Sequence, residues 1–159
     1  MEGQHIDTVT ADQFLSRAID FIHGSGTLCS NVSQGWLSSS VLLISQAFEL
    51  LAKRRLLLQG KTKEVLRRSP YGHDLHHLCG HETGLRDEAK TIAQDFLKRP
   101  SPNGVNVGFE FDVHFDAMAD AHSTDGKYSV RYHEGVRSFA NPKAMRVILN
   151  EIARRDRMR

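Results

Sequence analysis

A chain of 159 residues, with 40% apolar and 25% charged side chains, is long enough to bury a hydrophobic core, so we expect one domain over residues 1–159. The formal net charge of +2 is too small to indicate nucleic-acid binding by itself. No run of about 18 apolar residues is present, so we expect no helix that crosses a membrane.

The cysteine content and the first residues of the sequence bear on the cellular compartment of the protein. Cys29 and Cys79 are too few for a disulfide framework or a four-cysteine metal site, and we expect both to be reduced thiols. Residues 1–9 have neither the basic nor the apolar region of a secretory signal. We therefore predict a cytoplasmic protein in which residues 1–9 form a flexible arm.

A first helix is predicted directly after this arm. Thr10 followed three residues later by Gln13 resembles a capping box, in which the two side chains satisfy backbone amides at a helix start. Apolar residues at helical spacing follow as far as Ile22. Gly24 is expected to end this helix.

The clearest pattern in the chain runs from residue 37 to residue 58. Apolar side chains recur there in alternating steps of four and three residues and miss only at Arg55. Such a stripe is typical of a long helix in an antiparallel bundle, and Gly60 is expected to end it. Further leucines widen the apolar surface beyond one face: Leu42, Leu43, Leu50, Leu56 and Leu57. We therefore expect the helix to lie centrally in the bundle or also to meet another subunit, and we expect the protein to form a homodimer.

Three shorter segments are also predicted to be helical. Residues 61–68 are polar and basic and predict a short turn of helix, while residues 85–96 carry an apolar stripe. Asn141 followed by Pro142 predicts the start of the last helix, because asparagine caps the first turn and proline suits its first position. The chain closes on a basic tail at residues 154–159.

One segment is ambiguous between strand and helix. Residues 109–115 alternate apolar and polar side chains, as a half-buried strand does. No second strand is predicted to pair with them, and an isolated strand would leave its backbone groups without partners. We therefore expect a helix here, and an all-α antiparallel bundle of five to six helices overall.

The most unusual chemistry lies between Gly72 and His81, which hold four of the nine histidines and one of the two cysteines. A helix turns by about 100° per residue, so a helix over this segment would separate two faces. The buried face would carry Leu75, Leu78 and Cys79. The opposite face would carry His73, His77 and His81.

Imidazoles one helical turn apart can share a divalent metal ion. The cysteine, however, would lie on the opposite face, and no acidic residue is spaced to complete a ligand set. A solvated polar face is the simpler interpretation of the three histidines. We therefore expect neither a metal site nor any other cofactor.

Three short motifs, in this order, resemble the HEPN superfamily of small helical-bundle proteins. They are Glu49-Leu-Leu-Ala-Lys53 in the long helix, His73-Asp74-Leu75 in the histidine-rich stretch, and Arg131-Tyr132 ahead of the last helix. The resemblance covers residues 37–153 and departs from the family at His133, where a proline is usual. It implies a HEPN-like bundle that acts on RNA or nucleotides in a toxin–antitoxin or defence system, often beside a nucleotidyltransferase as partner protein.

Some members of this family are metal-independent endoribonucleases whose motif is an arginine, four to six residues, and a histidine. Arg68 and His73 fit that spacing, and so do Arg67 and His73. In this interpretation His73 moves a proton at the 2′-hydroxyl or the leaving oxygen, and an arginine holds the phosphate. Two such pairs would meet across a dimer. Against catalysis, Ser69 stands where catalytic members carry asparagine, histidine or aspartate, and the His-Asp-Leu motif is typical of members not thought to cleave RNA.

The alternative is a non-catalytic dimeric interaction module in which His73 caps and packs at a helix start. Its nucleotide- or phosphate-binding residues would be Arg131, Tyr132 and His77, since arginine can clamp a phosphate and tyrosine can stack on a base. Basic residues near the end of the long helix, at positions 67–68 and in the tail could form a phosphate-attracting patch if they share one side. Otherwise they are ordinary solvated charges.

Overall fold

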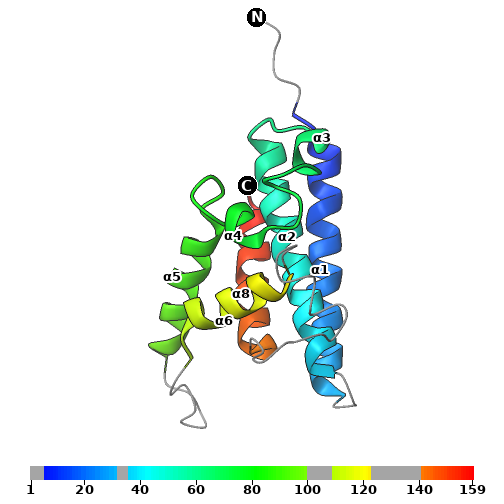
Figure 1. The fold of residues 1–159 in the computed structure, drawn as a ribbon. Coiled ribbons are helices and arrows are strands. Elements are labelled where there is room, and N and C mark those ends of the chain that lie inside the picture. The colour runs from blue at the N-terminus through cyan, green and yellow to red at the C-terminus, as the bar shows by residue number, and fades with distance from the viewer. Residues whose placement is uncertain (1–5, 32–35, 100–108, 123–140) are drawn as a thin grey trace, which may run out of the picture.

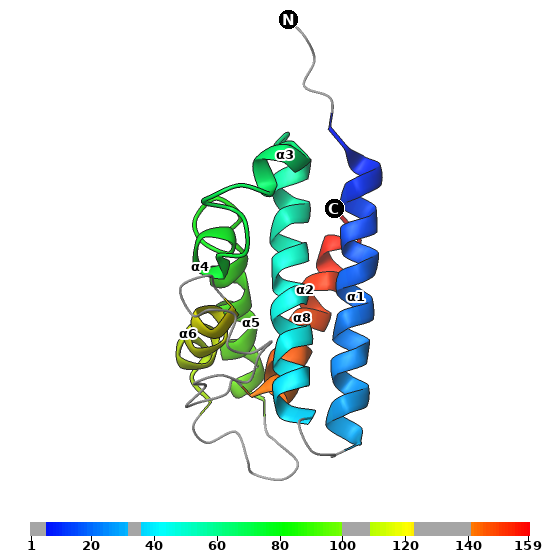
Figure 2. The same cartoon turned by 45° about the vertical axis from the view of Figure 1, so that its right-hand side comes forward.

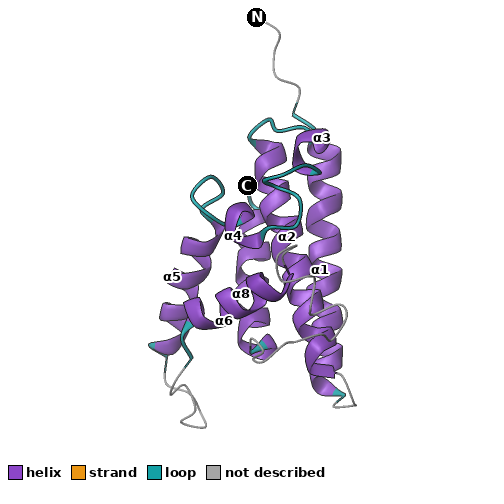
Figure 3. Ribbon diagram, in the orientation of Figure 1, coloured by secondary structure: helices purple, strands orange, loops and turns teal. Residues whose placement is uncertain are grey.

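The computed structural model describes residues 6–31, 36–99, 109–122 and 141–159, and every secondary-structure element in these ranges is a helix (Figure 3). Seven helices lie within the described part of the chain, of which two are single turns of four residues. The predicted all-α bundle is therefore confirmed. None of the described helices is both long enough and apolar enough to cross a membrane.

Three long helices form the centre of the bundle. α1 (Thr8–Ser30) and α2 (Trp36–Leu58) run antiparallel side by side, and α8 (Pro142–Asp156) packs against both (Figures 1 and 2). α2 is the most central of the three, because its Ile44 and Phe48 are fully buried and it also contacts the shorter helices. The long helix predicted from the apolar stripe is therefore confirmed.

The shorter helices cover another side of α2. α3 (Lys63–Leu66) lies within the predicted short helical segment, and α5 (Leu85–Leu97) matches the helix predicted from the apolar stripe at residues 85–96. α6 (Phe111–His122) confirms the helical choice for the ambiguous segment. α4 (Leu75–Leu78) and α6 both contact α2, and α6 crosses it obliquely (Figure 1).

Two predicted helix boundaries are confirmed by their cap geometry. Gly60 has a φ of 90°, and its amide donates to the Leu57 carbonyl at 2.9 Å, so α2 stops there. At the start of α8, the Asn141 side chain accepts a hydrogen bond from the Ala144 amide at 3.2 Å, with Pro142 in the first turn. Both boundaries follow from contacts within a few residues, which the sequence alone can reveal.

The predicted start of the first helix is wrong by one turn. α1 begins at Thr8, and its cap is Asp7, whose carboxylate accepts a hydrogen bond from the Thr10 amide at 3.0 Å. Thr10 is therefore a helical residue and not the cap of a capping box. The helix also takes up Thr8 and Val9, the last residues of the segment predicted as a flexible arm.

The predicted end of the first helix is also wrong, because α1 continues through Gly24 and Gly26. A Cβ atom at Gly24 would lie 3.2 Å from Leu43 Cδ1 of α2, and one at Gly26 would lie 3.1 Å from Arg146 Nη1 of α8. The two glycines therefore stand where neighbouring helices come close. Tertiary packing overrides the low helix propensity of glycine at these positions.

Gly24→Ala is expected to raise the free energy of unfolding by about 0.5–1 kcal/mol, because alanine favours the helix and restricts the unfolded chain. The contact it creates is with the end of the rotatable Leu43 side chain, which can move aside. Urea denaturation of both proteins measures the change. Gly84→Ala is the contrasting control and should destabilise, since Gly84 has a φ of 62°. A lower stability of Gly24→Ala would show that α1 and α2 cannot separate even slightly.

The histidine-rich segment does not form the helix that was predicted from Gly72 to His81. Within it α4 is a single turn, with Asp74 as its cap, whose carboxylate accepts a hydrogen bond from the His77 amide at 3.1 Å. The chain leaves the helix at Gly80, where a Cβ would lie only 3.0 Å from the His76 carbonyl oxygen. His73 and His81 therefore lie outside the helix, and the predicted three-histidine face does not exist.

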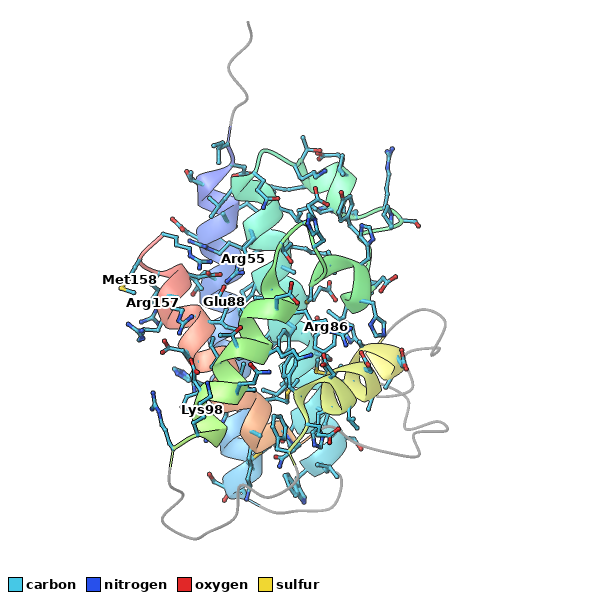
Figure 4. The ribbon with its side chains drawn as sticks, turned by 90° about the vertical axis from the view of Figure 1, so that its left-hand side faces the viewer. Arg55, Arg86, Glu88, Lys98, Arg157 and Met158 are labelled. Atoms are coloured by element: carbon cyan, nitrogen blue, oxygen red, sulfur yellow. The ribbon has the colours of Figure 1, made fainter. Side chains whose placement is uncertain are left out.

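Arg55, the one gap in the apolar stripe of α2, is buried and not exposed. Its guanidinium lies 2.9 Å from Asp156 Oδ1 of α8 and 2.7 Å from Glu88 Oε2 of α5, and it donates to the Thr83 carbonyl at 3.2 Å. Figure 4 shows Arg55 and Glu88 near each other where α2, α5 and α8 meet. A buried ion network therefore joins three helices at the one polar position of the apolar stripe.

The two cysteines are free thiols, as predicted. Both are buried, and Cys29 Sγ lies 3.6 Å from Ser40 Oγ across the α1–α2 contact. Burial raises the pKa of the Cys79 thiol well above its ordinary value, because a thiolate would lose its hydration inside the core. Cys79 is therefore not a reactive thiolate, and both buried cysteines pack as small apolar side chains.

Candidate functional site

The polar centre of the molecule is the carboxylate of Glu49, which lies in the middle of α2 and is only 5% exposed. Three nitrogens surround it. Lys53 Nζ lies 2.8 Å from Oε1, His122 Nε2 lies 2.8 Å from Oε2, and His73 Nδ1 lies 3.0 and 3.1 Å from the two oxygens. The Ser45 hydroxyl lies 3.0 Å from His122 Nδ1 and completes the group, which we call the Glu49 cluster.

The Glu49 cluster joins three parts of the chain that are far apart in sequence. Ser45, Glu49 and Lys53 follow one another at intervals of four residues on α2, so they share one face of that helix. His73 lies just ahead of α4, and His122 is the last residue of α6. The fold therefore gathers two imidazoles around one carboxylate that is already fixed by the central helix.

Hydrogen bonding limits the state of His122, which has no exposed surface. The Ser45 hydroxyl lies within hydrogen-bond distance of the Leu42 carbonyl, at 2.8 Å. The Ser45 oxygen also lies 3.0 Å from His122 Nδ1 and can accept from that nitrogen or donate to it. The other ring nitrogen faces the Glu49 carboxylate at 2.8 Å. A carboxylate can only accept, so Nε2 donates this hydrogen bond to Glu49.

The surroundings keep Glu49 ionised. Burial by itself would raise the pKa of this carboxyl, because a charged group loses hydration inside a protein. The hydrogen bond from His122 and the charge of Lys53 act in the opposite direction, as does the hydrogen bond from His73. Together they lower the pKa of Glu49 to about 2. Glu49 is therefore a carboxylate throughout the neutral pH range and can balance a cation beside it.

His73 is the part of the Glu49 cluster that faces outward. Its side chain is 41% exposed, whereas those of Glu49 and His122 are 6% and 0% exposed. The His73 and His122 rings meet edge to face with their centroids 6.2 Å apart. A molecule that approaches the cluster from solvent therefore meets the His73 imidazole first, with the carboxylate behind it.

The other histidines of the segment take different places. His77 is exposed, and its ring packs edge to face against Tyr71 with the centroids 5.1 Å apart. His76 Nε2 lies 2.7 Å from Asp120 Oδ1, which ties α4 to α6. Of the three histidines predicted to share a face, only His73 joins the Glu49 cluster. The prediction that His77 binds phosphate is not supported by any shared site with His73.

The predicted catalytic arginines lie near His73 in sequence but make no side-chain contact with it. Arg67 is the C-cap of α3, and Arg67 and Arg68 are both exposed. Neither side chain forms a hydrogen bond or an ion pair with another described residue. The Gly72 amide donates to the Arg68 carbonyl at 2.9 Å, so the chain turns back between Arg68 and His73. Arg131 and Tyr132, the predicted nucleotide-binding pair, lie outside the described residues.

Ion pairs neutralise most of the charges that were expected to form a basic patch. Cations with a carboxylate partner are Lys53, Arg55, Lys61, Lys63, Arg154, Arg155 and Arg159. Two arginines of the predicted basic tail, Arg154 and Arg155, belong to α8, where both pair with Glu151. The continuous patch that the sequence allowed is therefore reduced to local charges, among them Arg67 and Arg68.

Ion pairs on the outer face of α6 hold this helix in place beside the Glu49 cluster. Arg86 of α5 lies 3.0 Å from Asp112 Oδ1 and 2.9 Å from Asp116 Oδ1, and Lys90 also pairs with Asp112. Figure 4 shows Arg86 between α5 and α6. These contacts fix the helix whose last residue is His122, so they help to set the distance between His122 and Glu49.

Sequence reasoning missed His122 and Ser45, although a signal for His122 exists. Once residues 111–122 are taken as a helix, Phe111, Phe115, Met118 and His122 recur at steps of four, three and four. A histidine at the end of an apolar stripe must be buried and therefore needs a polar partner. Ser45 gives no comparable signal, because a serine on a long helix is usually unremarkable.

The Glu49 cluster has two chemical capacities. A carboxylate that holds one nitrogen of an outward-facing imidazole orients that ring for proton transfer. Glu49, His73 and His122 also place one ligand atom each within 4.8 Å of one another, which is close enough to hold a metal ion. Comparison of the chain with protein-family models, with curated proteins and with solved structures gives no match.

Proposed function

We propose that this chain is a HEPN-like domain that binds RNA and cleaves it by acid–base catalysis at His73. The observation that carries the proposal is the pair formed by His73 and Glu49, in which a half-exposed imidazole rests on a buried carboxylate at 3.0–3.1 Å. The all-α bundle and the motifs around Glu49 and His73 support the family assignment. The same proposal includes a cytoplasmic location, a role in a toxin–antitoxin or defence system, and a nucleotidyltransferase as partner protein.

The reaction needs no cofactor. Glu49 accepts a hydrogen bond from His73 Nδ1, which directs proton exchange to Nε2. Nε2 takes the proton of a ribose 2′-hydroxyl while the 2′-oxygen attacks the adjacent phosphorus and the bond from phosphorus to the 5′-oxygen breaks. The 5′-oxygen takes a proton from a second imidazole, the His73 of the other subunit in a homodimer. The products are a 2′,3′-cyclic phosphate and a 5′-hydroxyl.

The arginines supply the charge that this step requires. The non-bridging phosphate oxygens gain negative charge as the new bond forms, and a guanidinium stabilises that charge through two parallel hydrogen bonds. Arg67 and Arg68 are exposed, form no ion pair with a described residue, and lie on the turn that leads to His73. Either can therefore hold the phosphate while His73 moves the proton.

A second candidate function is a binding module without catalysis. The observation that favours it is that Glu49 already accepts hydrogen bonds from Lys53 and His122, so the whole group also serves to tie α2, α4 and α6 together. In that case His73 is one more structural contact. Arg67 and Arg68 would then attract a phosphate without cleaving RNA.

Cleavage of a generic single-stranded RNA in EDTA separates these functions. We expect the wild type to cleave it, and His73→Ala to reduce the rate by about 10²–10⁴-fold, the usual contribution of a general acid or base. His81→Ala is the matched control, since His81 is an exposed histidine in the same segment and should keep full activity. Circular dichroism checks that each variant is folded.

The outcomes are distinct. If the wild type leaves RNA intact at high protein concentration, catalysis is excluded and the binding module remains. If His73→Ala and the wild type cleave RNA equally, the activity does not belong to the His73–Glu49 pair. Glu49→Gln should lower the turnover number and leave the Michaelis constant nearly unchanged, because Glu49 orients the imidazole and does not touch RNA.

A further inference from the structure

We infer that Glu49, His73 and His122 form a binding site for a divalent transition metal ion of the Zn²⁺ class. One carboxylate and two imidazoles are a ligand set that Zn²⁺ takes in proteins when one position stays open. The three ligand atoms lie within 4.8 Å of one another and come from α2, from the segment ahead of α4 and from α6. This is a different set from the three histidines that the sequence suggested.

The partners of His122 also support this site. His122 Nδ1 lies 3.0 Å from the Ser45 oxygen, and Nε2 lies 2.8 Å from Glu49 Oε2. In metal sites a ligating histidine typically donates its second ring nitrogen to a fixed oxygen, which orients the ring. His122 has this arrangement, with Ser45 as the fixed oxygen and Nε2 directed at the carboxylate.

Lys53 is the group that opposes metal binding. Its ammonium lies 2.8 Å from Glu49 Oε1 and would repel a divalent cation. The lysine side chain has a long flexible stem, however, and Lys53 is 11% exposed, so its charged end can turn to solvent. A metal ion would then replace the ammonium beside Oε1 and a proton on Nε2, which limits the charge that accumulates in the site.

The open position of the site faces outward, because Glu49 and His122 are buried whereas the His73 ring is half-exposed. Metal binding through Nδ1 would draw His73 away from its hydrogen bond with the carboxylate. It would also make the ring a weaker base, since the metal withdraws electron density from it. If the proposed function holds, Zn²⁺ would therefore inhibit RNA cleavage. Metal binding itself does not depend on that function.

Isothermal titration calorimetry of the EDTA-treated, dialysed full chain with ZnCl₂ tests the site. We expect one ion per chain and a rise of the thermal midpoint with zinc concentration. His73→Ala should weaken binding at least tenfold, and Ser45→Ala, which removes the oxygen that orients His122, should weaken it about 10–100-fold. The matched control is His77→Ala combined with His81→Ala, which removes two exposed imidazoles and should leave the affinity unchanged.

Each result decides the inference. Loss of zinc binding in the His77/His81 double variant with full binding in His73→Ala would assign the metal to exposed histidines and overturn the site. The absence of any binding to the wild type would overturn it as well. Because binding is measured without RNA, a protein that binds zinc but leaves RNA intact keeps the metal site and loses only the proposed catalysis.

Discussion

Arg55→Met is expected to lower the free energy of unfolding by about 3–5 kcal/mol, the usual effect of removing one partner from a buried ion pair. The Asp156 side chain has no exposed surface, and Arg55 is its closest cation, with nitrogens 2.9 and 3.2 Å from the two carboxylate oxygens. Methionine fills a similar volume but leaves this carboxylate without its main partner. The predicted loss comes from the weaker compensation of this buried charge, since only the contacts with Arg159 and Arg54 remain, and not from a cavity.

The neighbours of Asp156 do not make up for the change. Arg54 Nη1 is 3.9 Å away, beyond hydrogen-bond distance, and Arg159 lies on the half-exposed end of the helix at 3.1 Å. Glu88 would also lose its 2.7 Å contact with Arg55. The pKa of Glu88 is lowered in the folded protein: burial would raise it, and the hydrogen bond and charge of Arg55 outweigh that effect.

Chemical denaturation of wild type and variant measures the predicted loss. Arg154→Met is the matched control. Arg154 pairs with Glu151 on the exposed face of α8, the helix that carries Asp156, so its replacement should change the free energy of unfolding little. Combining Arg55→Met with Asp156→Leu should recover part of the loss, since no buried carboxylate is then left unpaired. Equal stability of Arg55→Met and Arg154→Met would contradict the structural role of the buried network.

The parts of the fold that the sequence predicts well are those with short-range causes. The apolar stripe of α2 and its end at Gly60 depend on spacing and on a backbone conformation that glycine favours. The start of α8 depends on Asn141 and Pro142 alone. In these two cases the deciding contacts lie within a few residues. The helix at residues 111–122 was predicted for another reason, because no second strand was predicted to pair with residues 109–115.

Two of the wrong predictions have a different cause, which is contact between distant segments. Gly24 was predicted to end the first helix, but it lies inside α1, where Leu43 of α2 packs close to it. Arg55 was a gap in the apolar stripe, but α5 and α8 supply its carboxylate partners. The error in the histidine-rich segment is local instead, because Asp74 caps α4 and the helix ends at Gly80 after a single turn.

The candidate site likewise contains some residues that the sequence suggests and others that only the structure reveals. His73 was predicted from the sequence as a candidate catalytic residue, and in the structure it contacts the Glu49 carboxylate of the first family motif. Nothing in the sequence joins those two motifs to His122, which is 73 residues from Glu49 along the chain. The spacing of Arg67 and Arg68 from His73 brings their backbones close in the chain, but their side chains are exposed and form no ion pair with a described residue.

Phe115→Ala is expected to destabilise the protein by about 3–5 kcal/mol, the range for removing a buried aromatic side chain. Phe115 is fully buried, and its ring meets Phe48 of α2 edge to face with the centroids 5.6 Å apart. It also contacts Phe111 at 5.6 Å and lies under the Arg86 guanidinium at 4.9 Å. The residue is therefore the main apolar anchor of α6 on the central helix.

Loss of this anchor should reach the Glu49 cluster, because α6 also carries His122. A loosened α6 would let His122 move away from Glu49, so zinc affinity should fall together with stability. Val113→Ala is the matched control, since Val113 lies on the same helix with 60% of its surface exposed and should change neither quantity much. Phe115→Leu, which keeps most of the volume, should give intermediate values of both. If zinc affinity stayed constant across this series while stability fell, His122 would be held by the ion pairs of Arg86 and Lys90 and not by the core, and the metal site would be independent of how α6 packs.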